Sequence, residues 1–320
     1  MVFQTILDSL RYPIWQAPIA SLAGPELAAA VSSAGGMGSM ALTWTAPNVA
    51  ARQILQVRKA TSRPFLVNYA LSFPPTSLQA ALESGAPIVT FSWGDPAPYL
   101  QEVSAAGAAI GVQVARAAGA RRAVDQGAHF LICQGIEAGG HVQSTTPLAD
   151  LLPLVLEASG DLPVIAAGGM ATGRDVARAI RLGAKGAVLG TRFVATRESR
   201  AHPEYKRQLV ESRGETALTI CFDGGWPYSP HRVLRNSTLE AWEASGCPTL
   251  GQRPGEGETV AHTSDGEPIF RYETAAPREG YTGDIEAMCL YAGAAVGSVA
   301  DIPSAGDLVE RLGRECMDAA

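Results

Sequence analysis

The stretch Phe130-Leu-Ile-Cys-Gln-Gly-Ile-Glu-Ala-Gly-Gly-His141 joins an apolar run to a glycine-rich exit that ends on a histidine. Phe130–Cys133 has the character of a buried strand. The glycines at 135, 139 and 140 let the backbone approach a flat or phosphorylated ligand, which His141 could then act on. Taken alone, the stretch also fits a plain glycine-rich turn with a solvated histidine. Its surroundings decide between the two.

The same unit, an apolar strand followed by a turn and an Ala- and Leu-rich helix, recurs from residue 11 to about 195. Apolar strands that alternate with helices indicate a parallel sheet covered by helices. Eight units favour an α/β fold of the closed (β/α)8 TIM barrel type over an open sheet. The expected strands are Pro13–Ala17, Gly36–Ala41, Phe65–Tyr69, Ile88–Phe91, Ala109–Val114, Phe130–Cys133, Val164–Ala167 and Ala187–Gly190. The expected helices lie near 24–34, 47–61, 75–84, 96–106, 116–126, 148–159 and 172–182, with another after 200.

The composition changes after residue 221, where Gly, Pro, Glu and Thr become frequent and the alternation weakens. We interpret 222–282 as an inserted lid or substrate segment near the C-terminus. The barrel then comprises 1–221 and 283–320. An apolar helical pattern resumes over Asp284–Ala295, and a final helix is expected over Ala305–Cys316.

Composition narrows the classes of function. The chain has 320 residues, 47% hydrophobic and 18% charged, with a net charge of −6 and no basic run of the kind that binds nucleic acid. No apolar run has the length of a membrane span, and no secretory signal is apparent. The five cysteines are scattered without a C-x-x-C pair, which favours reduced thiols in a cytoplasmic protein over disulfides or a metal site.

Two loops have the composition of a phosphate site. In a (β/α)8 barrel a phosphate is often held by the loops after strands seven and eight. Here Ala167-Gly168-Gly169 follows the seventh strand and Gly190-Thr191 follows the eighth, so their amides could converge on one dianion. Two ordinary turns are the alternative. Because both loops stand where a phosphate is expected, we favour the phosphate. Neither loop matches the dinucleotide fingerprint or a P-loop.

Several segments together resemble the nitronate monooxygenase (2-nitropropane dioxygenase-like) family of FMN-dependent TIM barrels. They are Gln16-Ala-Pro-Ile19, Val67-Asn68, Gly135-Ile-Glu-Ala-Gly-Gly-His141, Ala166-Ala-Gly-Gly-Met-Ala-Thr-Gly-Arg174 and Leu189-Gly-Thr-Arg-Phe193. The resemblance covers residues 11 to about 200. It is specific for the superfamily and less so for the reaction, since flavin enoyl reductases and NADH:quinone reductases share these motifs.

The resemblance implies a role for each matching position. Ala17, Pro18 and Ile19 would lie beside the isoalloxazine ring of FMN, and Asn68 and Gln113 would hydrogen-bond its polar edge. Gly139 and Gly140 would flank the ribityl chain or the ring. Ala167, Gly168, Gly169, Gly190 and Thr191 would hold the phosphate, and His141 would face the substrate. Asn68 could instead satisfy backbone groups in the barrel mouth.

The implied activity is oxidation of an alkyl nitronate, or of a nitroalkane, with O2 to a carbonyl compound and nitrite. His141 would remove the α-proton as a neutral base or steady the nitronate as an acid; ordering its own loop is the remaining alternative. The rival is an NAD(P)H reductase acting on quinones or enoyl thioesters. A homodimer is left open. Trp44, Trp93, Trp226 and Tyr228 could wall a pocket or serve in packing. We expect His202 to cap a helix, and Arg192 to bind phosphate or form an ion pair.

Overall fold

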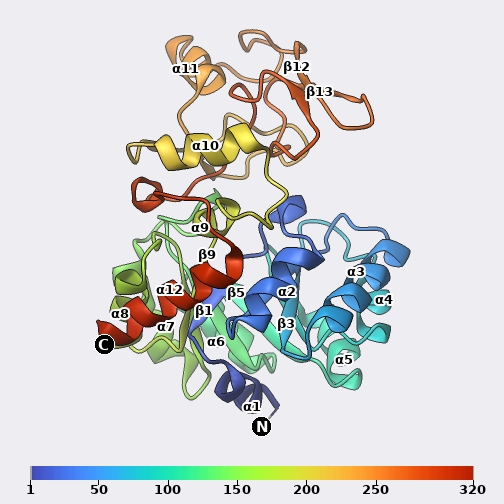
Figure 1. Ribbon diagram of the computed structural model, residues 1–320, viewed down its shortest axis with the longest axis vertical. Coiled ribbons are helices and arrows are strands. Elements are labelled where there is room, and N and C mark those ends of the chain that lie inside the picture. Colours follow the sequence, from blue (N-terminus) through green and yellow to red (C-terminus); the bar gives the residue numbers. More distant parts are fainter. Residues whose placement is uncertain (1, 320) are drawn as a thin grey trace.

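Eight parallel strands form the centre of the molecule in the computed structural model, which describes residues 2–319 (Figure 1). They are β1 (Ile14–Gln16), β2 (Gly38–Ala41), β3 (Phe65–Ala70), β4 (Ile88–Ser92), β5 (Ala109–Val114), β6 (Phe130–Gln134), β8 (Val164–Ala167) and β9 (Gly186–Leu189). β1 pairs with β9, and a parallel bridge between Trp15 and Met37 joins β1 to the chain just before β2. The strands therefore form the expected TIM-like barrel.

Helices cover the outside of this barrel. They are α2 (Pro25–Ser33), α3 (Pro47–Ala60), α4 (Leu78–Glu83), α5 (Ala97–Ala105), α6 (Ala117–Asp125), α7 (Leu148–Ser159), α8 (Gly173–Arg181) and α12 (Ala305–Asp318). The C-terminal helix α12 packs against both α8 and α2, so it fills the eighth place in the ring. The helix expected after 200 exists as α10 (Pro203–Glu211), but Figure 1 shows it above the barrel.

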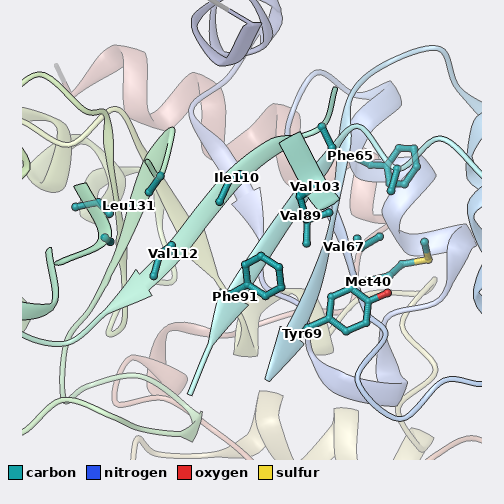
Figure 2. Packing of buried hydrophobic residues seen from close by; sticks show 14 of the residues in the cluster. Met40, Phe65, Val67, Tyr69, Val89, Phe91, Val103, Ile110, Val112 and Leu131 are labelled. Atoms are coloured by element: carbon teal, nitrogen blue, oxygen red, sulfur yellow. The ribbon is translucent and has the colours of Figure 1, made fainter. Parts of the chain in front are cut away.

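The barrel strands bury both faces, as their unbroken apolar runs predict. Outward-facing Val67, Val89, Ile110 and Leu131 pack beneath the helices in the largest core cluster (Figure 2). Residues that alternate with these along the strands, such as Leu66, Ile88 and Ile132, belong to a second cluster that also contains Trp15 and Phe130. This alternation is the strand period of two and places the second cluster inside the barrel.

The lower end of the barrel is closed by a helix that the sequence did not lead us to expect, α1 (Val2–Ser9). The Phe3 ring stacks on Phe130 with centroids 4.0 Å apart and lies 6.3 Å from the Trp15 ring. Phe130 also lies against Gly111, where a Cβ atom would come within 2.3 Å of the aromatic ring. An aromatic plug therefore fills the bottom of the barrel and leaves its upper mouth for a ligand.

A smaller lobe lies above the mouth (Figure 1). One antiparallel sheet joins β10 (Thr216–Thr219), β11 (His231–Leu234) and β7 (Gly140–His141), so the loop after β6 is part of this lobe. A second sheet joins β13 (Pro268–Phe270), β12 (Thr259–His262) and β14 (Thr282–Gly283). The lobe also contains α11 (Ser237–Ala244), while the short helix α9 (Thr191–Val194) follows β9 directly.

The prediction of a helix over Asp284–Ala295 is wrong. This segment is irregular, because neighbouring elements hold its backbone groups individually. The Asn236 side chain donates to the carbonyl oxygens of Glu286 and Met288, at 2.7 and 2.8 Å. The amide of Leu234 donates to Leu290, and that of Ala292 donates to Arg232. Contacts with distant residues have overridden the local helical pattern.

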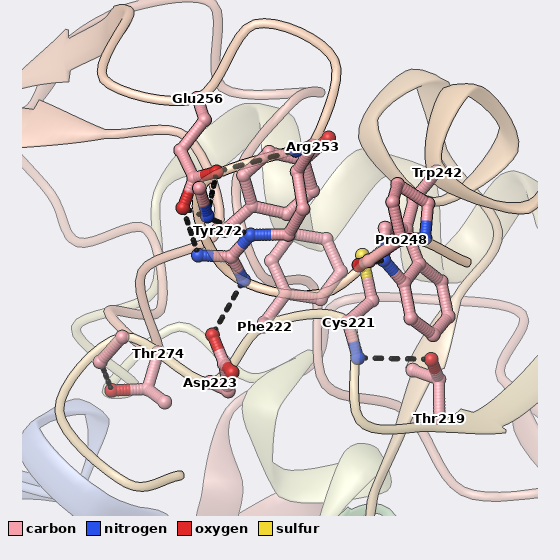
Figure 3. Close-up of polar contacts among 12 residues, drawn as sticks. Thr219, Cys221, Phe222, Asp223, Trp242, Pro248, Arg253, Glu256, Tyr272 and Thr274 are labelled. Atoms are coloured by element: carbon pink, nitrogen blue, oxygen red, sulfur yellow. Dashed lines mark hydrogen bonds and ion pairs between the residues drawn. The ribbon is translucent and has the colours of Figure 1, made fainter. Parts of the chain in front are cut away.

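A buried arginine organises the irregular part of the lobe (Figure 3). The Arg253 side chain is 6% exposed and forms ion pairs with Asp223 at 2.6 Å and Glu256 at 2.8 Å. Its guanidinium carbon lies 4.4 Å from the centroid of the Tyr272 ring, within the range of a cation–π contact. Arg253 thereby ties three loops together. All five cysteines are free, and none of the helices within residues 2–319 combines the length and apolar character needed to span a bilayer.

Candidate active site

Two adjoining cavities occupy the upper mouth of the barrel, where the C-terminal ends of the strands meet. We call the one bordered by Gly168 and Gly169 the glycine cavity, and the one bordered by Trp44, Trp93 and Trp226 the aromatic cavity. Their empty volumes, including space open to solvent, are about 710 and about 990 Å³.

Every residue to which the resemblance gave a role in binding FMN or facing the substrate borders one of these cavities. The glycine cavity takes Ala167, Gly168 and Gly169, and the aromatic cavity takes Ile19, Gly140 and His141. Ala17, Pro18, Asn68, Gln113, Gly139, Gly190 and Thr191 border both. The positions lie on or directly after six of the barrel strands, which the barrel brings to one end.

The glycine cavity presents backbone amides that have no partner. The amides of Gly168, Gly169, Gly190 and Thr191 make no hydrogen bond to any residue between 2 and 319. The nearby N-terminus of α8 is already capped, because the Asp175 carboxylate accepts hydrogen bonds from the amides of Ala171 and Thr172. These four residues all border the glycine cavity, and their unpaired amides together suit an anion.

Backbone conformation explains the glycines at this position. Gly168 and Gly169 have φ angles of +112° and +65°, a region that side-chain-bearing residues seldom adopt. A Cβ atom at Gly169 would lie 2.8 Å from the Cβ of Glu137. The Glu137 carboxylate is itself engaged, since it accepts from the amide of Leu148. Glu137 therefore braces its own loop against the start of α7.

His141 lies on β7 beneath a cover of aromatic rings. Its imidazole stacks on Trp226 at a centroid distance of 4.2 Å, and its buried Nε2 has no hydrogen-bond partner among residues 2–319. Burial, reinforced by the neighbouring His231, lowers the pKa of His141 to about 3. The imidazole is therefore neutral at pH 7, which argues against the protonated alternative in the unliganded protein.

Gln134 positions the histidine loop and was missed by sequence reasoning. Its Nε2 donates to the carbonyl oxygen of His141 at 3.2 Å, and its Oε1 accepts from the amide of Gln143 at 2.9 Å. Gln134 is the last residue of β6 and borders both cavities. A buried polar residue at the end of an apolar strand was the available signal.

The two predicted amide side chains are partly engaged with protein groups. Asn68 donates from Nδ2 to the carbonyl oxygen and hydroxyl of Thr90, at 3.2 and 3.1 Å. Gln113 donates from Nε2 to Oε1 of Gln143 at 2.8 Å. In residues 2–319 the amide oxygens of Asn68 and Gln113 have no partner, so both can accept a hydrogen bond from a ligand.

The structure also decides among the remaining candidates. Arg192 is 2% exposed and forms an ion pair with Asp301, so it serves the fold and not the phosphate loops. His202 caps α10 by accepting from the amide of Glu204, as expected. Tyr228 is 86% exposed and does not border the cavities.

His231 lies behind His141 with a fixed tautomer: Nδ1 contacts the Ser229 carbonyl oxygen at 2.9 Å and Nε2 accepts from the amide of Phe222.

The cavities are completed by residues that the sequence analysis did not place there. Tyr205 and Tyr291 border the aromatic cavity; Gly293, Ala295 and Val296 border the glycine cavity.

Comparisons with known proteins show which family the chain belongs to. A family model described as "Nitronate monooxygenase" matches residues 3–315. A nitronate monooxygenase of Pseudomonas aeruginosa is 33% identical, covering 78% of this chain and 84% of that protein. A hydroxy-methyl-oxo-octahydro-indene-carboxyl-CoA dehydrogenase of Mycobacterium tuberculosis is also 33% identical, covering 75% of this chain and 68% of that protein.

Solved structures with similar folds carry different activities in their names. FabK from Thermotoga maritima superposes with a TM-score of 0.80 at 30% identity, over 98% of this chain and 95% of that one. Nitroalkane oxidase from Streptomyces ansochromogenes superposes with a TM-score of 0.80 at 29% identity, over 98% of each chain. The likeness therefore extends over nearly the whole chain, but the named reactions differ.

Proposed function

This chain belongs to the nitronate monooxygenase family of flavin oxidoreductases, and from that premise we propose that it is an FMN-dependent nitronate monooxygenase. Its substrates would be alkyl nitronates, which it would oxidise with O2 to a carbonyl compound and nitrite. The observation that carries the proposal is a neutral, half-buried His141 in a cavity that adjoins four unpaired backbone amides. Members of the family are in general flavin-dependent.

The residues present fit FMN. The amides of Gly168, Gly169, Gly190 and Thr191 would donate to its phosphate, and Ala167 would complete that loop. The free amide oxygens of Asn68 and Gln113 would accept from the N–H side of the ring. Ala17, Pro18, Ile19, Gly139 and Gly140 would contact its apolar surfaces. When bound, FMN supplies the electron-transfer chemistry, while the protein supplies orientation and a dry cavity.

His141 would orient the substrate and not remove a carbon-bound proton. A base whose conjugate acid has a pKa of about 3 is weak, so it abstracts such a proton poorly. This favours a preformed nitronate over a neutral nitroalkane. The segment 222–282 supplies Trp226 and Ala276 to the lining, which supports a lid role for it.

A flavin reductase is the second candidate, favoured by the likeness to FabK and to the CoA-ester dehydrogenase. Such an enzyme must bind NAD(P)H, whose phosphates carry several negative charges. No Lys or Arg borders either cavity among the residues that the structure describes. This lack of cations favours the monooxygenase.

Anaerobic mixing separates the two candidates. We expect the purified protein to be yellow, and its flavin absorption to be bleached by an alkyl nitronate without NADH. His141→Asn should keep the flavin but lose most of this bleaching, while His262→Asn, an exposed position on β12, should behave as the original chain. Bleaching by NADH alone would establish the reductase. A protein that stays colourless when FMN is supplied would overturn both.

A further inference from the structure

Four large aromatic residues pack together at the aromatic cavity: three tryptophans border it, and Phe73 contacts two of them from outside the lining. We call Trp44, Phe73, Trp93 and Trp226 the aromatic wall. Trp226 is at its centre, with ring centroids 5.2 Å from Phe73, 5.0 Å from Trp93 and 6.1 Å from Trp44. All three of these contacts are edge-on, the arrangement that aromatic quadrupoles prefer. The wall is therefore an assembled packing unit.

The wall is drawn from segments far apart in the chain. Trp44 follows β2, Phe73 follows β3 and Trp93 follows β4, whereas Trp226 comes from the upper lobe. Trp93 has a φ angle of +59°, which costs an aromatic residue more than a glycine and turns up preferentially at functional sites. The upper lobe thus covers the barrel mouth with Trp226, and three barrel loops meet it there.

The wall is continuous with the proposed reaction centre. Trp226 stacks on the His141 imidazole at an interplanar angle of 27°, and Trp93 meets the same ring edge-on at 6.2 Å. At the other end, Trp44 remains 59% exposed. A substrate whose reactive group reaches His141 therefore has its side chain beside the wall, with a way out to solvent past Trp44.

The lining lacks formal charge. None of the residues that border the aromatic cavity is Asp, Glu, Lys or Arg, and the same holds for the glycine cavity, within the described part of the chain. The His141 imidazole is neutral as well. An anionic group on the substrate's side chain would lose its hydration here without gaining a cation as a partner.

We propose that the aromatic wall is the subsite for the substrate's side chain and that it selects uncharged aromatic or bulky apolar nitronates. Nitronates that carry a second anionic group, such as a carboxylate, are rejected. Flat rings stack on Trp226 and Trp44, and the missing cation supplies the discrimination against anions. The identity of the substrates as nitronates rests on the proposed function, whereas the recognition of uncharged rings by the aromatic wall does not.

The first test measures binding without turnover. Phenylacetamide (the amide) and 4-carboxyphenylacetamide (the acid) share the neutral group that would lie at His141 and differ by a carboxylate at the far end of the ring. Calorimetric titration of the purified protein with each therefore measures the effect of charge on the side chain. We expect the amide to bind at least about tenfold more tightly. Trp44→Ala and Trp226→Ala should each weaken the amide about tenfold, the scale of one lost aromatic contact. Trp44 is exposed, so its replacement leaves the fold intact.

Trp242→Ala is the matched control, because Trp242 lies on α11 outside both cavities. It should leave the affinity for phenylacetamide unchanged. Equal affinities for the amide and the acid would overturn the charge selection. Unchanged affinity for the amide in both Trp44→Ala and Trp226→Ala would overturn the wall as the subsite.

The second test measures selectivity in turnover. We expect kcat/KM to fall in the order of the nitronates of phenylnitromethane, nitroethane and 3-nitropropanoate, and Trp226→Ala to reduce the first value most. The reverse order would contradict the proposal. If no nitronate is turned over, the proposed function fails, while the binding titrations still decide whether the aromatic wall recognises uncharged rings.

Discussion

The low pKa of His141 predicts that this residue makes the folded protein sensitive to acid. The unfolded chain takes up a proton on this imidazole near pH 6.5, whereas the folded chain does so only near pH 3. Between these values the unfolded state binds more protons, so the free energy of unfolding falls as the pH falls. The contribution of His141 is complete above pH 6.5 and is lost as the pH approaches 3.

The magnitude follows from the size of the shift. A change from 6.5 to about 3 corresponds to about 5 kcal/mol in total, of which about 2 kcal/mol is lost between pH 7.5 and pH 5. His231, whose pKa burial also lowers, faces His141 at a centroid distance of 5.5 Å and adds a dependence of its own. Because His231 is present in both proteins, its contribution largely cancels when the original chain is compared with His141→Asn.

Urea unfolding at a series of pH values between 7.5 and 4.5 provides the measurement. As the pH falls from 7.5 to 5, the original chain should lose about 2 kcal/mol more free energy of unfolding than His141→Asn loses. His262→Asn, a substitution at an exposed histidine, is the control and should run parallel to the original chain. If the His141→Asn curve is also parallel, the imidazole is not held neutral by burial, and the argument for a dry site fails.

Three further predictions concern the fold and the glycine loops. Gly169→Ala should weaken FMN binding at least about tenfold in a fluorescence titration, because the new Cβ would lie 2.8 Å from Glu137 at a positive φ angle. Gly107→Ala is the control: its φ angle is also positive, but its Cβ would lie in open space, so the affinity for FMN should be unchanged. Asp301→Asn should lower the free energy of unfolding by about 2 kcal/mol. This is less than the loss of a fully buried ion pair would cost, because the Asp301 side chain is 45% exposed. An unchanged midpoint of urea unfolding would contradict the structural role given to Arg192. Phe3→Ala should cost about 3 kcal/mol by removing the plug beneath the barrel, and a loss below 1 kcal/mol would show that α1 is dispensable.

The barrel was predictable because its signal is local and repeated. Each strand is an apolar run of a few residues and each helix begins and ends at recognisable residues, such as Thr172 before α8. The positions of the site residues were predictable for a related reason. Parallel strands place their carboxyl ends at one edge, so Gly168, Gly190 and His141 had to meet once the barrel was assumed.

The features that escaped prediction depend on partners far away in the sequence. Arg192 was ambiguous until Asp301, 109 residues later, proved to be its partner. The segment 284–295 has the pattern of a helix, yet hydrogen bonds from Asn236 and its neighbours hold it irregular. The eighth helix of the ring is α12, because the chain first builds the upper lobe and then returns.

The sequence by itself determined the barrel, its open end and the glycine loops, since these follow from the period of apolar residues and from backbone freedom at glycine. Only the tertiary structure decided the state of His141. Its low pKa arises because Trp226, 85 positions further along the chain, stacks on the imidazole and covers part of its surface, with His231 beside it. Burial is a property of the whole packed molecule, and no local pattern encodes it.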